Sequence, residues 1–268
     1  MHSASGYLAV ATILVYLLLA GWIGWRLKKG ILPQKSGIML VAIFALGLHL
    51  LTLAFDLLRP DGGQNLSIMN IASVSGWAIS LMLTLLYVKK PLQVLLPFTY
   101  AFTAIVILTD LVSSDTYFTH LEAHPSLIIH ISLSLLSYAV LNIAALMAIL
   151  LAVINRQLKE KKKFALSPVL PPLMTVEKQI FNLILVGTVL LSFALATGIF
   201  FLDNFFGSGK AHKAILSAIA WAIYTVVLIQ HYRVGVRGRW LVTSTVVGAV
   251  LLTLGYFGSR FVREIILA

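Results

Sequence analysis

Long apolar stretches recur along the whole chain, and short polar segments separate them. Each stretch has about 20 residues or more, which is the length that an α-helix needs to cross the ~30 Å hydrocarbon core of a membrane. The apolar residues run continuously instead of alternating at every second position, which argues against a transmembrane β-barrel. The pattern therefore predicts an all-α fold, a polytopic membrane helix bundle of about eight transmembrane helices. We expect these helices at residues 6–27, 37–58, 66–88, 92–112, 126–154, 177–202, 211–232 and 239–262.

Composition supports a membrane protein. Of the 268 residues, 60% are hydrophobic and 11% are charged, whereas roughly 25% of the residues in a typical soluble domain are charged. An apolar excess of this size has to face lipid, and eight spans with short loops account for the whole length. We therefore predict a single transmembrane domain over residues 1–268. The absence of cysteine excludes disulfides, Cys-ligated zinc, iron–sulfur clusters and covalent c-type haem attachment to this chain.

The basic residues predict how the chain is oriented in the membrane. The net charge is +11, but the Lys and Arg residues sit in short clusters between apolar runs, which argues against nucleic acid as a partner. Fifteen of the 20 lie in or beside the first, third, fifth and seventh loops. The positive-inside rule places those loops in the cytoplasm and both the N-terminus and the C-terminus outside. Because the basic residues follow the first apolar run, we interpret this run as a retained helix and not as a signal peptide.

Three of the predicted spans carry polar side chains at helical spacing, and polar groups within a membrane usually face the bundle interior. The three groups are His49, Thr52 and Asp56; His130, Ser134, Ser137 and Asn142, with Tyr138 beside them; and Ser217, Trp221, Tyr224 and His231. We expect Trp221 and Tyr224 to face the bundle interior beside the fifth span.

Histidine is a common haem ligand because a neutral imidazole offers a nitrogen lone pair. His49 and His130 are candidates of this kind, and the alternative is that each forms a hydrogen bond that holds neighbouring helices together. For His231 the structural role is the favoured interpretation. The sequence THLEAH places His120 near Glu122, but we interpret it as a solvated loop and predict no metal site. No G-x-S-x-G, P-loop or H-E-x-x-H motif is present, so we predict no enzyme activity and no catalytic residues.

Four long segments resemble one known family. They are HPSLIIHISLSLLSYAVLNIAALMAILLAV, LPPLMTVEKQIFNLILVG, AILSAIAWAIYTVVLIQHYRVGVRGRW and LLTLGYFGSR. Together they resemble the cytochrome c assembly protein family, polytopic membrane proteins that handle haem. GQNLSIMN and THLEAHPS favour its eight-span YpjD/HemX-like branch. The resemblance covers about 63–260 and implies a multi-pass protein of the bacterial inner (plasma) membrane, with haem as the suspected cofactor.

The resemblance also implies cofactor-binding residues. His130 matches the family's external haem-ligating histidine, which precedes a long helix, and His49 matches a histidine of this branch in the second span. His231 lies near a His-Thr-Arg position of the family but is offset by about two residues. We predict that His49 and His130 lie near each other in the outer half of the bundle and form a pair that can bind haem.

The sequence departs from the haem exporters of this family in two places. Their tryptophan-rich loop before the seventh span is replaced by FLDNFFGSGKAHKAILSAIAW, and the histidine that follows their last span has no counterpart. Two functions therefore remain open: a haem-handling protein, and a membrane scaffold or regulatory subunit of the same fold that has lost haem binding. The expected partners are the lipid bilayer, haem and another membrane protein. A small-solute transporter is less favoured, because inverted repeats and broken helices are not evident.

Overall fold

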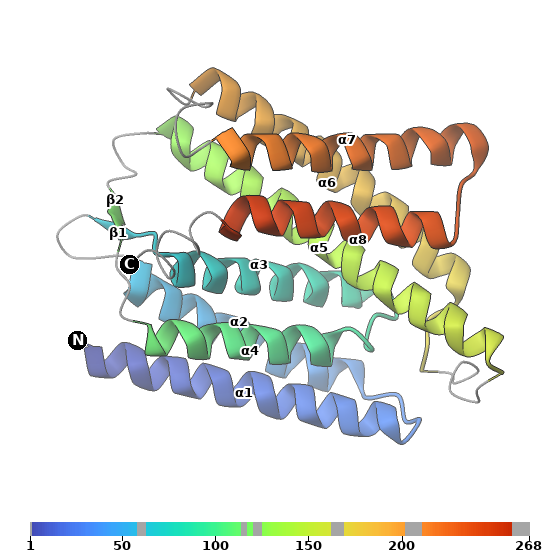
Figure 1. Cartoon of the computed structure of the whole chain (residues 1–268). Helices are drawn as coiled ribbons and strands as arrows, with labels where there is room; N and C mark the ends of the chain where they lie inside the picture. Colours follow the sequence, from blue (N-terminus) through green and yellow to red (C-terminus); the bar gives the residue numbers. More distant parts are fainter. Residues whose placement is uncertain are drawn as a thin grey trace. The chain divides into compact units, whose positions relative to one another are not determined.

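The computed structural model describes residues 2–57, 63–113, 117–119, 125–161, 169–201 and 211–258. These residues form eight α-helices, which confirms the predicted helical membrane bundle (Figure 1). The helices are α1 (His2–Lys28), α2 (Lys35–Leu57), α3 (Ile68–Lys89), α4 (Leu96–Val112), α5 (Pro125–Lys159), α6 (Leu173–Phe201), α7 (Ala211–Val234) and α8 (Arg239–Thr253). A π-helical turn, η3 (Leu254–Gly258), continues α8, and two short strands are β1 (Gln64–Asn65) and β2 (Phe118–Thr119). The predicted ends of the second, sixth and last spans, residues 58, 202 and 262, lie outside the described residues.

Seven of these helices are long and apolar enough to cross a membrane, and α4 is shorter. The span expected at 92–112 begins only at Leu96. Pro97 lies in the first turn of α4, where its missing N–H is not needed, whereas a helix begun at residue 92 would require residue 97 to donate to the carbonyl of Gln93. Lys90 precedes Pro91, is therefore extended, and ends α3. Large apolar side chains such as Leu18, Leu40 and Phe98 are about 70% exposed or more, which is the surface expected of helices that face lipid.

The chain divides into two compact units, which are described separately. Unit 1 comprises Met1–Leu121 with Lys163–Pro171 and contains α1 to α4, whereas unit 2 comprises Glu122–Lys162 with Pro172–Ala268 and contains α5 to α8. Both units consist of membrane helices, and one transmembrane domain over residues 1–268 stays a prediction.

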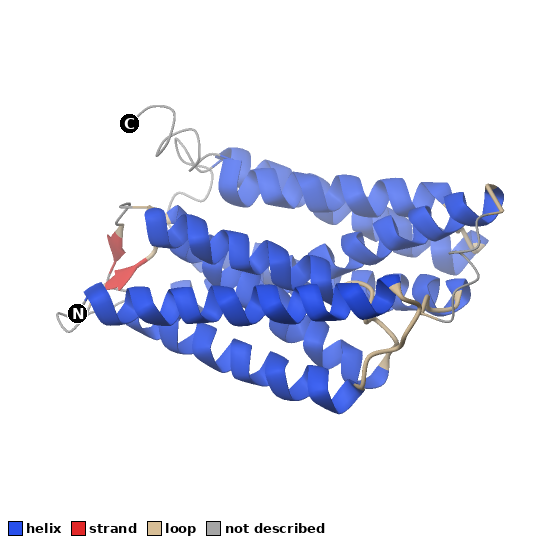
Figure 2. Ribbon diagram, turned by 90° about the horizontal axis from the view of Figure 1, so that it is seen from below, coloured by secondary structure: helices blue, strands red, loops and turns tan. Residues whose placement is uncertain are grey.

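In unit 1, α1 packs against α2 and α4, while α3 packs against α2 and α4. The antiparallel strands β1 and β2 lie at the end of the unit where α1 begins (Figure 2). The Oδ1 of Asn65 accepts hydrogen bonds from the backbone N–H groups of Ser67 (3.2 Å) and Tyr117 (3.0 Å). Ser67 in turn caps α3, because its hydroxyl accepts from the N–H of Asn70 at 3.3 Å. The segment GQNLSIMN thus fastens the start of α3 to the small sheet.

In unit 2, α5 packs closely against α6 and also against α8, and α7 packs against α6 and α8. Tyr224 is fully buried, in agreement with its predicted interior position. Its hydroxyl donates to the carbonyl of Thr245 on α8 at 3.2 Å. The prediction of an interior position for Trp221 is wrong. Its side chain is 37% exposed. Its Nε1 donates to Ser192 Oγ on α6 at 2.8 Å, so the indole bridges α7 and α6 at a partly exposed position.

Candidate functional site

His49 of unit 1 lies in a closed polar environment. Its side chain is fully buried, its Nε2 is 3.1 Å from the hydroxyl of Ser73, and its Nδ1 is 3.4 Å from the hydroxyl of Tyr16. The rings of Tyr16 and His49 also meet edge to face, with centroids 5.8 Å apart. Because both ring nitrogens contact hydroxyl groups, an iron atom could bind His49 only after one of these contacts had been broken.

The hydroxyl groups around His49 belong to a larger set, of which the sequence pattern indicated only Thr52. Thr84 and Tyr100 join their hydroxyls at 2.8 Å, as do Ser80 and Thr103. Further members are Thr12 and Thr52, whose hydroxyls are 3.4 Å apart. All of these side chains are buried: Thr12, Tyr16, Thr52, Ser73, Ser80, Thr84, Tyr100 and Thr103. A signal was present on α3, where Ser73, Ser80 and Thr84 repeat at i, i+7 and i+11.

His130 of unit 2 presents a different geometry. The imidazole is half-buried, and its Nδ1 lies 3.0 Å from the carbonyl oxygen of Ala194 and 3.2 Å from the hydroxyl of Thr197. A carbonyl oxygen can only accept a hydrogen bond, so Nδ1 carries the proton. The Nε2 of the neutral ring therefore holds the lone pair, which is the tautomer that a metal-ligating histidine needs.

The polar side chains predicted to share a face of the fifth span form hydrogen bonds with different partners. The hydroxyl of Ser137 donates to the carbonyl of Gly187 on α6 at 3.0 Å. Tyr138 instead joins its hydroxyl to that of Thr253 on α8 at 3.2 Å, and Asn142 donates to the carbonyl of Tyr138 within α5 at 2.8 Å. These groups tie α5 to both neighbours and do not converge on one site.

His231 lies near the last turn of α7 and packs flat on Phe181 of α6, with ring centroids 3.4 Å apart and planes 16° apart. Tyr232 meets the same imidazole edge to face. Within the part of the chain that the structure describes, the buried Nδ1 of His231 has no hydrogen-bond partner. The aromatic packing fits the structural role favoured for this residue.

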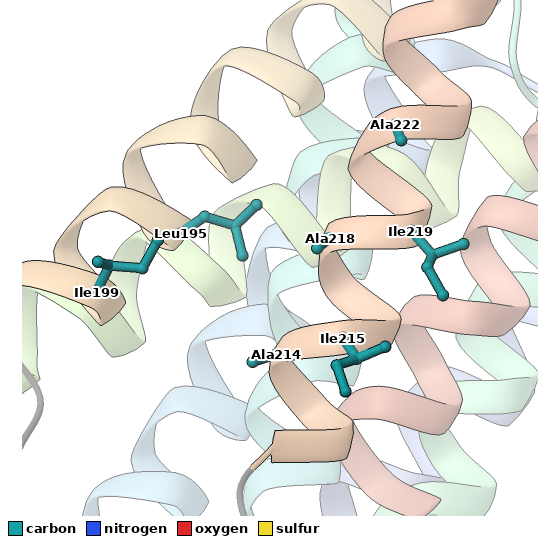
Figure 3. A pocket seen from close by; sticks show the side chains of 7 residues that line it. All are labelled: Leu195, Ile199, Ala214, Ile215, Ala218, Ile219 and Ala222. Atoms are coloured by element: carbon teal, nitrogen blue, oxygen red, sulfur yellow. The ribbon is translucent and has the colours of Figure 1, made fainter. Parts of the chain in front are cut away.

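An apolar groove of about 380 Å³ opens between α6 and α7 (Figure 3). It is lined by Leu195, Ile199, Ala214, Ile215, Ala218, Ile219 and Ala222. The lining residues of α6 alternate with Ala194 and Thr197, the two residues that His130 contacts. Because successive residues of a helix turn by about 100°, Leu195 and Ile199 point to a different side of α6 from these two, and His130 does not line the groove.

Across residues 2–57, 63–113, 117–119, 125–161, 169–201 and 211–258, no group of three or more His, Cys, Asp or Glu side chains could hold a metal ion. His120 and Glu122 of THLEAH lie outside the described residues. The candidate ligands among the described residues are thus single histidines in hydroxyl-rich or apolar surroundings.

Comparison with known proteins shows to which family the chain belongs. The family model described as cytochrome c assembly protein matches residues 38–267. This chain belongs to the cytochrome c assembly protein family. It is 43% identical over 243 residues to inner membrane protein YpjD of Escherichia coli K12, which covers 88% of this chain and 92% of that protein. It is also 32% identical over 143 residues to an uncharacterized 28.8 kDa protein of Azospirillum brasilense, which covers 52% of each chain. No solved structure matches.

Membership of the cytochrome c assembly protein family confirms the resemblance seen in the sequence and, with the seven candidate spans, a multi-pass protein of the inner membrane. The family is associated with haem handling, but membership does not say which histidine of this chain binds haem. His49 belongs to unit 1 and His130 to unit 2, so their predicted pairing stays a prediction.

Proposed function

We propose that this member of the cytochrome c assembly protein family handles haem in the inner membrane and binds it through the Nε2 of His130. The observation that carries the proposal is the bond from Nδ1 of His130 to the carbonyl of Ala194 at 3.0 Å. Haem-ligating histidines commonly donate their second ring nitrogen to a backbone carbonyl, which fixes the tautomer and the ring orientation. His130 already has this support from α6.

The groove between α6 and α7 lies on a different side of α6 from the residues that contact His130. Its lining is almost entirely apolar, and small-molecule sites are concave and mostly apolar, with few polar groups. A haem macrocycle is largely apolar, and if bound it would supply an iron atom that an imidazole nitrogen can ligate. An apolar ligand in the groove would contact Leu195 and Ile199 but not His130, so the proposal rests on the contacts of His130 with α6 and not on the groove. The ligand roles predicted for His49 and His231 lack comparable support and are not part of this proposal.

Haem titration of the purified full-length protein in lipid nanodiscs tests the proposal, with the Soret band as the readout. The informative variant is His130→Gln, since a glutamine amide can still donate to the carbonyl of Ala194 but does not serve as a haem ligand. We expect haem affinity to fall at least tenfold, which corresponds to about 1.4 kcal/mol. His212→Ala, which removes an exposed histidine near the start of α7, is the control and should leave the affinity unchanged.

Two results would contradict the assignment. One is unchanged haem affinity in His130→Gln, and the other is an equal loss in the control variant. Addition of imidazole to His130→Ala gives a further check, because a free ligand can restore an axial bond to iron but cannot restore the helix contact.

A second function has one sequence observation in its favour. The tryptophan-rich loop of the haem exporters is replaced by residues 201–221 of this chain, which contain one tryptophan, Trp221. A scaffold or regulatory subunit that has lost haem binding would need no such loop. In that case the wild-type protein binds no haem in the titration and co-purifies with another membrane protein.

A further inference from the structure

The groove between α6 and α7 opens on the surface of unit 2 that faces lipid. Along α7 its floor is a row of three alanines, Ala214, Ala218 and Ala222, which recur at every fourth residue and therefore lie on one side of the helix. Ile215 and Ile219 flank this row and are about half exposed, and Ala218 is exposed as well. The groove is therefore an open channel on the surface and not a closed cavity inside the bundle.

A hydrogen bond between the two helices marks the inner end of the groove. Trp221 Nε1 of α7 donates to Ser192 Oγ of α6 at 2.8 Å, next to Ala222, at the inner end of the alanine row. In Figure 3 the ribbons of α6 and α7 stand further apart at the level of Ala214 than at that of Ala222, and Leu195 points across the gap toward α7. The channel thus runs from this bond toward the start of α7.

The groove has the depth of one leaflet of the membrane. The start of α7 lies on the side that the basic residues predict to be outside. Trp221 comes ten residues after the first residue of α7, which corresponds to ~15 Å along the helix axis. The hydrocarbon core of a bilayer is ~30 Å thick, so the bond of Trp221 lies near its middle. A ligand that fills the groove therefore belongs to the outer leaflet.

The width of the groove fits a hydrocarbon chain better than a helix. Ala214 and Ala222 are ~12 Å apart along α7, so a volume of about 380 Å³ corresponds to a mean cross-section of roughly 30 Å². An α-helix with its side chains is about 10–12 Å across, and its cross-section is roughly 80–110 Å². A transmembrane helix of a partner would also continue past the middle of the bilayer, where the side chain of Trp221 bridges the two helices.

The mouth of the groove suits a phosphate group. The first N–H groups of a helix have no acceptor within the helix, and the N-terminus attracts anions. The first turn of α7 contains no acidic residue, and Lys213 lies in this turn, directly before Ala214 of the groove. Positive charge at the mouth and an apolar channel behind it match the two parts of an anionic phospholipid.

We propose that the groove binds an anionic phospholipid of the outer leaflet, with one acyl chain along the alanine row and the phosphate at the start of α7. The bound chain fills the space between the outer halves of α6 and α7 and so joins them. The site lies within unit 2 and does not include His130, so it stands or falls independently of the proposed function.

Native mass spectrometry of the full-length protein in a mild detergent tests the site, with dioleoyl phosphatidylglycerol as the probe. We expect the wild type to retain one phospholipid per chain. Ala218→Leu places a larger side chain in the channel and should lower the bound fraction at least fivefold. Ala218 is exposed, so the larger side chain displaces no core residue.

The matched control is Ala152→Leu. Ala152 of α5 is also exposed but does not line the groove, so this variant should bind phosphatidylglycerol like the wild type. A second variant tests the headgroup. Lys213→Gln should lower the binding of phosphatidylglycerol at least threefold and leave that of dioleoyl phosphatidylcholine, which has the same chains and no net charge, unchanged.

Unchanged phospholipid binding in Ala218→Leu would overturn the site. Equal losses in Ala218→Leu and Ala152→Leu would do the same, because they would show that lipid coats the whole surface without preference. A dimer that carries no lipid and that Ala218→Leu separates would make the groove an interface between two copies of the chain, which also contradicts the proposal. If Lys213→Gln binds phosphatidylglycerol as the wild type does, the charged headgroup is not recognised as proposed.

Discussion

Replacement of Gly187 by alanine should destabilise unit 2 strongly. A Cβ atom placed on Gly187 would lie 2.5 Å from both Cγ and Cδ2 of Leu141 on α5. Carbon atoms pack favourably at about 3.5–4.0 Å, so the added methyl group overlaps Leu141 by roughly 1 Å. Leu141 is fully buried and cannot turn away into lipid. The close approach of α5 and α6 at this point therefore requires glycine, as is common where membrane helices pack tightly.

The expected loss follows from two effects. Overpacking a well-packed interior typically costs about 1–3 kcal/mol. In the wild type the hydroxyl of Ser137 donates to the carbonyl of Gly187 at 3.0 Å, and separation of the two helices would lengthen this hydrogen bond. Such bonds in membranes contribute about 0.6 kcal/mol on average. We therefore expect Gly187→Ala to lower the free energy of unfolding by about 2–3 kcal/mol. Titration with SDS in mixed micelles, with helicity as the readout, measures this quantity.

Two comparisons make the result specific. A Cβ on Gly47 of α2 would have nothing within 4 Å, so Gly47→Ala should not destabilise the protein. In Leu141→Ala the side chain that collides is gone, so Gly187→Ala should cost much less in that background. If Gly187→Ala is as stable as the wild type, or if its effect simply adds to that of Leu141→Ala, the close helix contact does not exist as described.

The positions of the membrane helices could be predicted from the sequence because the length of an apolar run is itself the physical requirement for a span. The start of α4 could not be predicted this way. Leu92 and Leu95 are as apolar as the helix that follows, but Pro97 is favoured in the first turn of a helix and Gln93 donates its side-chain amide to the carbonyl of Val169. A hydropathy profile depends only on how apolar each residue is, so it detects neither feature.

The buried hydroxyl groups of unit 1 could hardly be predicted from the sequence. Serine and threonine barely change the hydropathy of a span, and within a helix they can bond to a carbonyl one turn back, as Thr84 does with Ser80 at 2.6 Å. Their role depends on which residues face them from other helices. Tyr16 and His49 are 33 positions apart in the chain, and only the packing of α1 on α2 brings them together.

The candidate ligands illustrate the same limit. His130 could be singled out from its place near the start of a long helix, but its tautomer depends on a carbonyl 64 residues away, on α6. The face assigned to Trp221 and Tyr224 was correct for one residue only. Residues three apart on a helix differ by about 60° in direction, which suffices to put Tyr224 against α8 and leave Trp221 partly exposed.

Topology and polar contacts can each be checked directly. The chain has no cysteine, so a single cysteine introduced at residue 2 or 268 should react with an impermeant maleimide from outside, and labelling only from the cytoplasm would reverse the predicted orientation. Asn65→Ala should lower the free energy of unfolding by roughly 1–3 kcal/mol in the same SDS titration, because two backbone donors lose their acceptor. Tyr224→Phe should cost less, about 0.6 kcal/mol. The reason is that the lost hydroxyl donates at 3.2 Å to the Thr245 carbonyl, which lies within α8 and can keep its own helical hydrogen bond, so no buried group is left without a partner. A loss above about 2 kcal/mol would exceed what such bonds contribute in membranes and would show that the hydroxyl has a partner besides Thr245.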